Sequence, residues 1–97
     1  MRVDNCNQTV YEYQDWRFKV FTEEGQIIFL QIRDNVQKML KQTGAFKHTY
    51  AYGSVSSDSY TMAACIDRLV ELKEIIIVSP DSTIWCDRIY TRGLLPE

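Results

Sequence analysis

The chain has 97 residues and a formal net charge of -2, with 45% hydrophobic and 25% charged residues. This length accommodates one domain with a single hydrophobic core and leaves no room for a second. The slight acidity excludes a protein that coats nucleic acid or a membrane surface through its overall charge. The local charge is uneven, however, because Lys38, Lys41 and Lys47 lie between Asp34 and Asp58 with no acidic residue among them. Such a segment forms either a basic face or an ordinary solvated helix face.

Three cysteines, at positions 6, 65 and 86, form no close pair. Scattered cysteines are typical of a reducing compartment and predict neither a disulfide framework nor a zinc site. The N-terminus shows no charged-then-apolar leader, and no apolar run approaches membrane-spanning length. We therefore expect a cytoplasmic protein with no membrane partner, no cofactor and no metal.

The N-terminal part is expected to consist of a flexible start, residues 1–8, and a strand region, residues 9–21. In the second part Trp16, Phe18 and Val20 alternate with Arg17 and Lys19. Alternation of apolar and charged residues is typical of a half-buried strand. A strand or hairpin is therefore expected to precede the main domain, residues 22–92.

A long helix is predicted over residues 23–42. Ile28, Ile32 and Val36 recur every four residues, and Gly44 lies where a C-terminal cap is expected. Gly25 leaves an alternative open, in which TEEG forms a hairpin turn and residues 27–32 form a strand before a shorter helix.

After the first helix, the sequence predicts a loop or a short irregular turn over residues 45–56. A second long helix is then expected, with Ser57 or Asp58 as its N-terminal cap. The apolar stripe of this helix includes Met62, Cys65 and Leu69. A short apolar strand over 75–78, a turn over 79–82 and a second strand over 84–91 follow, and we expect the two strands to pair.

This order of elements resembles the winged helix-turn-helix domain from residue 23 onward. The resemblance rests on IDRLVELKEI, residues 66–75, which matches the pattern L-x-x-x-G-x-I before a β-hairpin except that Lys73 stands at the glycine position. It implies an α+β domain of winged-helix type with two main helices and a C-terminal β-hairpin wing. The middle helix of the family would fall in AFKHTYAYGSVS, residues 45–56, which forms helix poorly, so we expect an irregular connection or a single turn there.

The resemblance implies that the helix starting near Ser57 enters the major groove of DNA. The contacts would then come from the start of that helix and from flanking cations, namely Ser57, Ser59, Tyr60, Thr61, Lys47, His48, Arg88 and Arg92. The first turns of the helix contain no Arg or Lys for the commonest base contact. DNA binding by a transcriptional regulator, of bacterial or phage type, is therefore favoured mainly if a homodimer pools these basic residues.

Binding of a protein partner is the alternative, as in a small inhibitor, immunity or anti-defence protein. Tyr50, Tyr52 and Tyr60 are of the residue type that anchors interfaces, although we expect at least half of these tyrosines to pack internally. Catalysis is not expected. The single histidine, His48, is predicted to be exposed in a basic loop, and the sequence carries no nucleophile motif and no phosphate-binding glycine loop.

Overall fold

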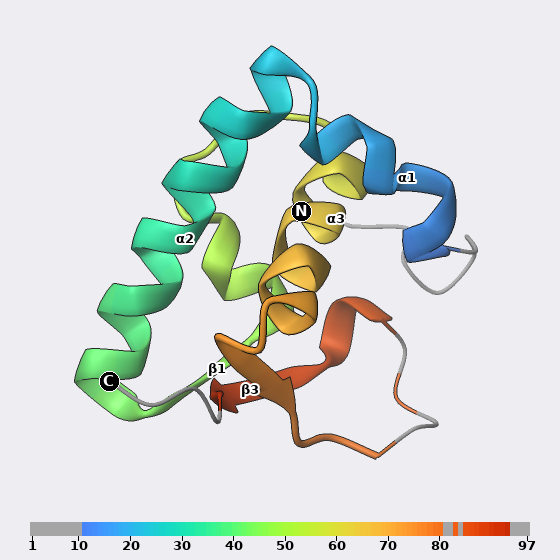
Figure 1. Ribbon diagram of the computed structural model, residues 1–97. Helices are drawn as coiled ribbons and strands as arrows, with labels where there is room; N and C mark the ends of the chain where they lie inside the picture. The colour runs from blue at the N-terminus through green and yellow to red at the C-terminus, as the bar shows by residue number, and fades with distance from the viewer. Residues whose placement is uncertain (1–10, 81–82, 84, 94–97) are drawn as a thin grey trace.

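The computed structural model describes residues 11–80, 83 and 85–93 (Figure 1). These residues form an α+β domain with three α-helices and a small antiparallel sheet. In chain order the elements are α1 (Tyr13–Val20), α2 (Glu23–Thr43), β1 (Ala45–Lys47), the 3-10 helix η2 (His48–Tyr52), α3 (Ser59–Glu71), β2 (Ile75–Ile77), the 3-10 helix η3 (Trp85–Asp87) and β3 (Ile89–Arg92). The predicted flexible start, 1–8, lies outside the described residues.

Helix α2 confirms the predicted long helix and settles the alternative at Gly25, which lies inside it. The Thr22 side chain accepts a hydrogen bond from the Gly25 backbone N–H at 2.9 Å and so caps the helix. A Cβ atom at Gly25 would lie 1.8 Å from the carbonyl oxygen of Lys19, so only glycine allows the end of α1 to pack here. At the other end, Gly44 adopts a left-handed conformation with φ 81°.

The predicted N-terminal strand was wrong, because residues 13–20 form helix α1. Trp16 and Val20 are four residues apart, and this spacing fits one face of a helix as well as one face of a strand. Val20 is fully buried and Trp16 packs on the core, whereas Phe18 is 61% exposed. The domain therefore has three α-helices rather than two main ones.

Helix α3 carries the predicted apolar stripe into the centre of the core, where Cys65, Ile66 and Leu69 are fully buried. After the C-terminus of α3, Lys73 adopts a left-handed backbone conformation with φ 66°. The Lys73 N–H donates to the Val70 carbonyl and the Glu74 N–H donates to the Leu69 carbonyl. This pair of bonds is a Schellman motif, which usually has glycine at the position of Lys73.

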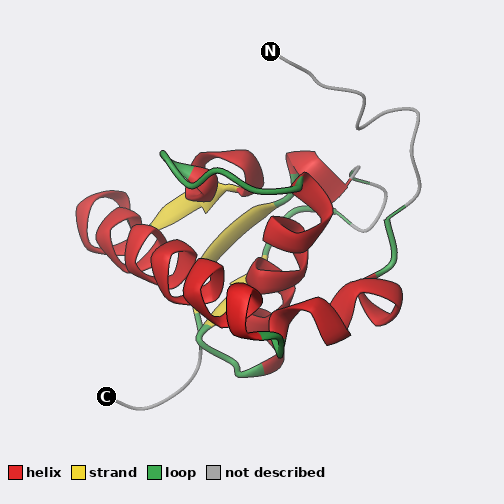
Figure 2. Ribbon diagram, turned by 90° about the horizontal axis from the view of Figure 1, so that it is seen from above, coloured by secondary structure: helices red, strands yellow, loops and turns green. Residues whose placement is uncertain are grey.

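The sheet has the strand order β1-β3-β2, and both pairs are antiparallel. The predicted pairing of the two C-terminal strands is confirmed, although β3 covers only residues 89–92 and follows η3. The predicted loop over 45–56 was wrong in part, since it contains strand β1 and one 3-10 turn, η2. Viewed from above, the strands lie behind α2 (Figure 2). Asp81 and Ser82, in the predicted turn over 79–82, lie outside the described residues.

Candidate functional site

His48 lies at the centre of a buried aromatic layer and not in an exposed loop, so that prediction was wrong. Its side chain is 1% exposed, with Nδ1 3.0 Å from the Tyr90 hydroxyl and Nε2 2.8 Å from the Tyr52 hydroxyl. Burial, followed by the nearby charge of Arg88, lowers the pKa of His48 to about 3. Two hydroxyl partners let a neutral imidazole be buried without an unsatisfied nitrogen. His48 therefore stabilises the core and does not reach a ligand.

Two of the three tyrosines predicted as contacts also belong to this layer. The ring of Tyr60 lies 5.0 Å from that of Trp16 and 5.8 Å from that of Trp85, measured between centroids. Tyr52 is held by His48 and packs against the core. Tyr50 is different, because 68% of it is exposed. Among the three, only Tyr50 is mostly exposed to solvent.

One side of α3, which carries Ala63, Asp67 and Glu71, is covered by the segment that contains α1. We call this side the flank of α3. Ala63 and Ala64 on this helix are fully buried, and Asp67 is only 8% exposed. Small side chains allow a second helix to approach closely, and Figure 1 shows α1 crossing α3 near its first turns. A helix that reads the major groove needs this flank to face solvent. In this fold the flank faces α1 instead.

Polar contacts fix the covering segment in place. The Tyr11 hydroxyl donates to Asp67 at 2.7 Å, and the Tyr13 hydroxyl donates to Glu71 at 2.7 Å. Arg17 Nε also donates to Glu71, at 3.1 Å. The hydrogen bond from Tyr13 is the main reason that the pKa of Glu71 is lowered to about 2. The flank thus carries two carboxylates, which have the wrong sign for phosphate.

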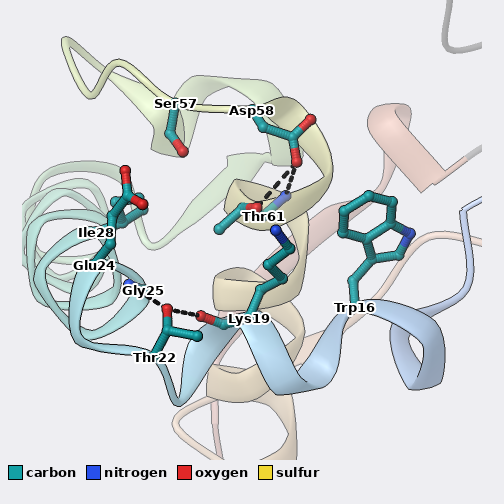
Figure 3. A pocket seen from close by; sticks show the side chains of 9 residues that line it. All are labelled: Trp16, Lys19, Thr22, Glu24, Gly25, Ile28, Ser57, Asp58 and Thr61. Atoms are coloured by element: carbon teal, nitrogen blue, oxygen red, sulfur yellow. Dashed lines mark hydrogen bonds between the residues drawn. The ribbon is translucent and has the colours of Figure 1, made fainter.

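A pocket of about 420 Å³ lies where the end of α1 meets the first turns of α2 and α3 (Figure 3). Two carboxylates, Glu24 and Asp58, and one ammonium group, Lys19, are among its lining side chains. Figure 3 shows these three groups on separate elements around the opening. Its other lining residues are Trp16, Thr22, Gly25, Ile28, Ser57 and Thr61. The lining therefore has an excess of negative charge.

The predicted contacts at the start of α3 lie beside this pocket. Asp58 Oδ2 accepts hydrogen bonds from the backbone N–H of Thr61 at 3.1 Å and from its hydroxyl at 3.0 Å. The Thr61 side chain is thus buried, and its hydroxyl donates to Asp58 within the protein. Ser57 lines the pocket, and Ser59 is exposed at the first position of α3. This end of the helix carries a carboxylate where phosphate binding would favour a vacant cap.

The predicted cations do not gather around that end of α3. Lys47 Nζ lies 3.4 Å from Asp87, and Arg88 Nη1 lies 3.9 Å from the carboxylate of Asp67. Arg92 is placed at the end of β3 opposite the first residue of β2, beyond the C-terminus of α3. The ten predicted contact residues therefore do not form one surface.

Sequence reasoning missed four large apolar side chains around the corner between α1 and α2. Phe18 is 61% exposed, Phe21 is 49% exposed, and Ile27 and Leu30 are each 58% exposed. We call these four residues the corner surface. The helical period of α2 could have indicated two of them, because Ile27 and Leu30 lie off its buried stripe.

Contacts around the corner connect α1 with α2 and α3. The guanidinium carbons of Arg17 and Arg68 lie 4.9 Å and 5.0 Å from the centroid of the Phe21 ring. Gln26 Nε2 donates to the Val20 carbonyl, so α2 is fixed to the end of α1. Ile27 lies three residues after Glu24 and therefore beside it on the helix surface. The apolar corner surface thus adjoins the acidic pocket.

Among the described residues, no group of three or more His, Cys, Asp or Glu side chains could hold a metal ion. Within the same residues, no helix combines the length and apolar character needed to span a membrane. Comparisons with protein-family models, with curated proteins and with solved structures found no match to this chain. The functional argument therefore rests on the geometry of the chain itself.

Proposed function

We propose that the chain is a small non-enzymatic regulatory module of winged-helix type that acts by binding another protein. The carrying observation is that the flank of α3 is covered, while the corner surface exposes four large apolar side chains. Clustered exposed apolar groups mark interaction sites on soluble proteins, and Phe is enriched at the centres of interfaces.

The winged-helix assignment is supported by the order of the elements and by one conformation. Helix α2, the turn η2 and helix α3 precede two paired strands, as the family pattern requires. Lys73 has the left-handed backbone that the pattern assigns to glycine. Strand β1 completes the sheet beside β3.

The chemistry of the corner indicates what the partner presents. Exposed carboxylates at Glu12, Asp15, Glu23 and Glu24 lie on α1, its cap and the first turn of α2. Charge complementarity then favours a partner segment that carries Lys or Arg next to apolar side chains. One of its cations would enter the pocket beside Glu24, while its apolar groups cover the corner surface.

Selection of random displayed peptides on the full chain tests this proposal. We expect enrichment of peptides that combine Leu, Phe or Trp with Lys or Arg. The double variant Ile27→Ser/Leu30→Ser should lose these peptides, and Glu24→Lys should disfavour the cationic ones. Both altered apolar residues are exposed, so the fold should be kept, as circular dichroism would verify.

Tyr50→Ser is the matched control, since it removes a more exposed side chain from another surface. Binding that survives the corner variant and is lost with Tyr50→Ser would transfer the site to the loop around η2. Selection of acidic peptides, or of none, would contradict a protein-binding corner of this charge.

A further inference from the structure

A second surface of the molecule concentrates positive charge, and it lies far along α2 from the corner surface. A groove of about 460 Å³ is lined by Asp34, Gln37, Lys38, Leu40, Lys41 and Arg92. Three of these side chains are cationic and one is anionic, on a chain whose net charge is -2. The cations come from two elements, the C-terminal half of α2 and the end of β3.

We propose that this groove, which we call the basic groove, binds the phosphate backbone of a nucleic acid. Lys38 and Lys41 are three residues apart, so they lie next to each other on the same helix face. Arg92 adds a guanidinium group from the strand, and Gln37 adds an amide donor to the lining. Cations that converge from separate elements can contact successive phosphates of one strand.

The acidic residue in the basic groove does not cancel this charge. Asp34 lies 3.2 Å from Lys38 Nζ, but both side chains are more than 60% exposed, at 63% and 68%. An exposed pair of this kind contributes little, so a phosphate can take its place at low cost. Beside the groove, the Lys73 backbone contacts Gly93, the residue after Arg92, and Lys73 is exposed. Lys73 lies at the edge of this end of the sheet and is not counted among the three cations that line the groove.

The surroundings favour nucleic acid over an anionic membrane. A membrane site needs apolar side chains next to the cations, so that they enter the acyl region. Among the described residues, Leu40 is the only apolar one that lines the groove, and it packs against the core. The large exposed apolar residues of α2, Ile27 and Leu30, lie at its other end. This surface also differs from the start of α3, where the sequence resemblance places DNA contacts. The basic groove therefore acts through backbone charge and not through base reading.

Salt-dependent binding of a short labelled DNA duplex, and of one of its single strands, to the full chain tests the inference. Binding is measured between about 50 and 200 mM salt, and the slope of log K against log salt is determined. Three phosphate contacts predict a slope near -2.7 for the duplex and of about -2 for the single strand. The double variant Lys38→Gln/Lys41→Gln should reduce the magnitude of the slope by about 2 and weaken binding equally for different sequences. Lys19→Gln, which removes a cation near the corner, should leave the slope unchanged.

Two results would overturn the inference. The first is the absence of salt-dependent binding at the low end of this range. The second is an unchanged slope in the Lys38→Gln/Lys41→Gln variant, whose fold is checked by circular dichroism. Retention on vesicles of anionic lipid without binding of either nucleic acid would assign the basic groove to membranes instead. The corner variant Ile27→Ser/Leu30→Ser should keep the slope, so failure here and failure of the protein-binding proposal are separate results.

Discussion

The buried imidazole of His48 gives the fold a defined sensitivity to acid. The ordinary pKa of histidine, 6.5, applies to the unfolded chain, whereas the pKa in the folded chain is about 3. As the pH falls below 6.5 the unfolded chain takes up the proton first, so stability is full above 6.5 and is lost progressively down to about pH 3. Each pH unit in this window costs about 1.36 kcal/mol, so lowering the pH to about 4.5 should cost about 2.7 kcal/mol.

Two carboxyl groups near the same core affect acid stability in other ways. Burial raises the pKa of Asp67 above its ordinary value. Burying the charged carboxylate costs stability, and this cost falls as the pH drops and the folded chain protonates Asp67. The pKa of Glu71 is lowered to about 2, so its contribution is lost only below its ordinary value of 4.5. The variant His48→Gln separates the histidine from both. It loses stability at neutral pH, but it should not show the additional loss between pH 6.5 and about 4.5.

Urea unfolding followed by tryptophan fluorescence at several pH values provides the measurement. Trp16 and Trp85 both lie in the aromatic layer and should report its loss. Equal changes in the free energy of unfolding for the wild type and His48→Gln between neutral and acid pH would refute the reasoning. An NMR titration of the folded protein that places the His48 pKa near 6.5 would also refute it.

Three further predictions concern the backbone, the thiols and the buried carboxylate. Lys73→Gly should stabilise the fold by about 1 kcal/mol in urea unfolding, because a left-handed backbone disfavours a Cβ atom. Gly44→Ala is its counterpart and should destabilise the fold by a similar amount, because φ is 81° at Gly44. Apart from its two chain neighbours, no described residue has an atom within 4 Å of the added carbon, so the effect isolates the backbone. The same sign for both variants would contradict the assignment. Burial raises the pKa of Cys65 to about 12. A thiol reagent should therefore modify Cys65 in the native protein only as fast as the core opens. Rapid labelling would show instead that the core is accessible. Tyr11→Phe should cost about 1–3 kcal/mol because it removes a donor from a buried carboxylate, whereas Tyr13→Phe, at an exposed pair, should cost less; the reverse order in thermal unfolding would disprove the burial argument.

Local signals predicted the elements whose patterns and caps agree. Helix α2 has a four-residue apolar repeat, a threonine cap and a terminal glycine, and each of these acts within a few residues of chain. The stripe of α3 and the pairing of β2 with β3 follow from equally local patterns. The non-enzymatic role, in contrast, stays a prediction, and so does the partner class, which the binding experiments above address.

The sequence was misleading where one pattern fits two periods. Trp16 and Val20 suit a strand and a helix equally, and the helix forms because that side of α1 packs against α3 and α2. Strand β1 has only three residues, and its partner β3 lies at the other end of the domain sequence, so no local pattern could indicate it. His48 similarly obtains its hydroxyl partner on β3 only when the sheet assembles.

The amino-acid sequence by itself determined the long helices, their caps and the hairpin, because propensity, periodicity and capping are short-range effects. Tertiary structure alone decided which surfaces are available. It covers the flank of α3 with α1, leaves the corner surface exposed and brings Arg92 to Lys38 and Lys41. Exposure and charge convergence depend on how distant elements pack, and this is the physical reason that the candidate sites differ from the residues that the sequence pattern indicated.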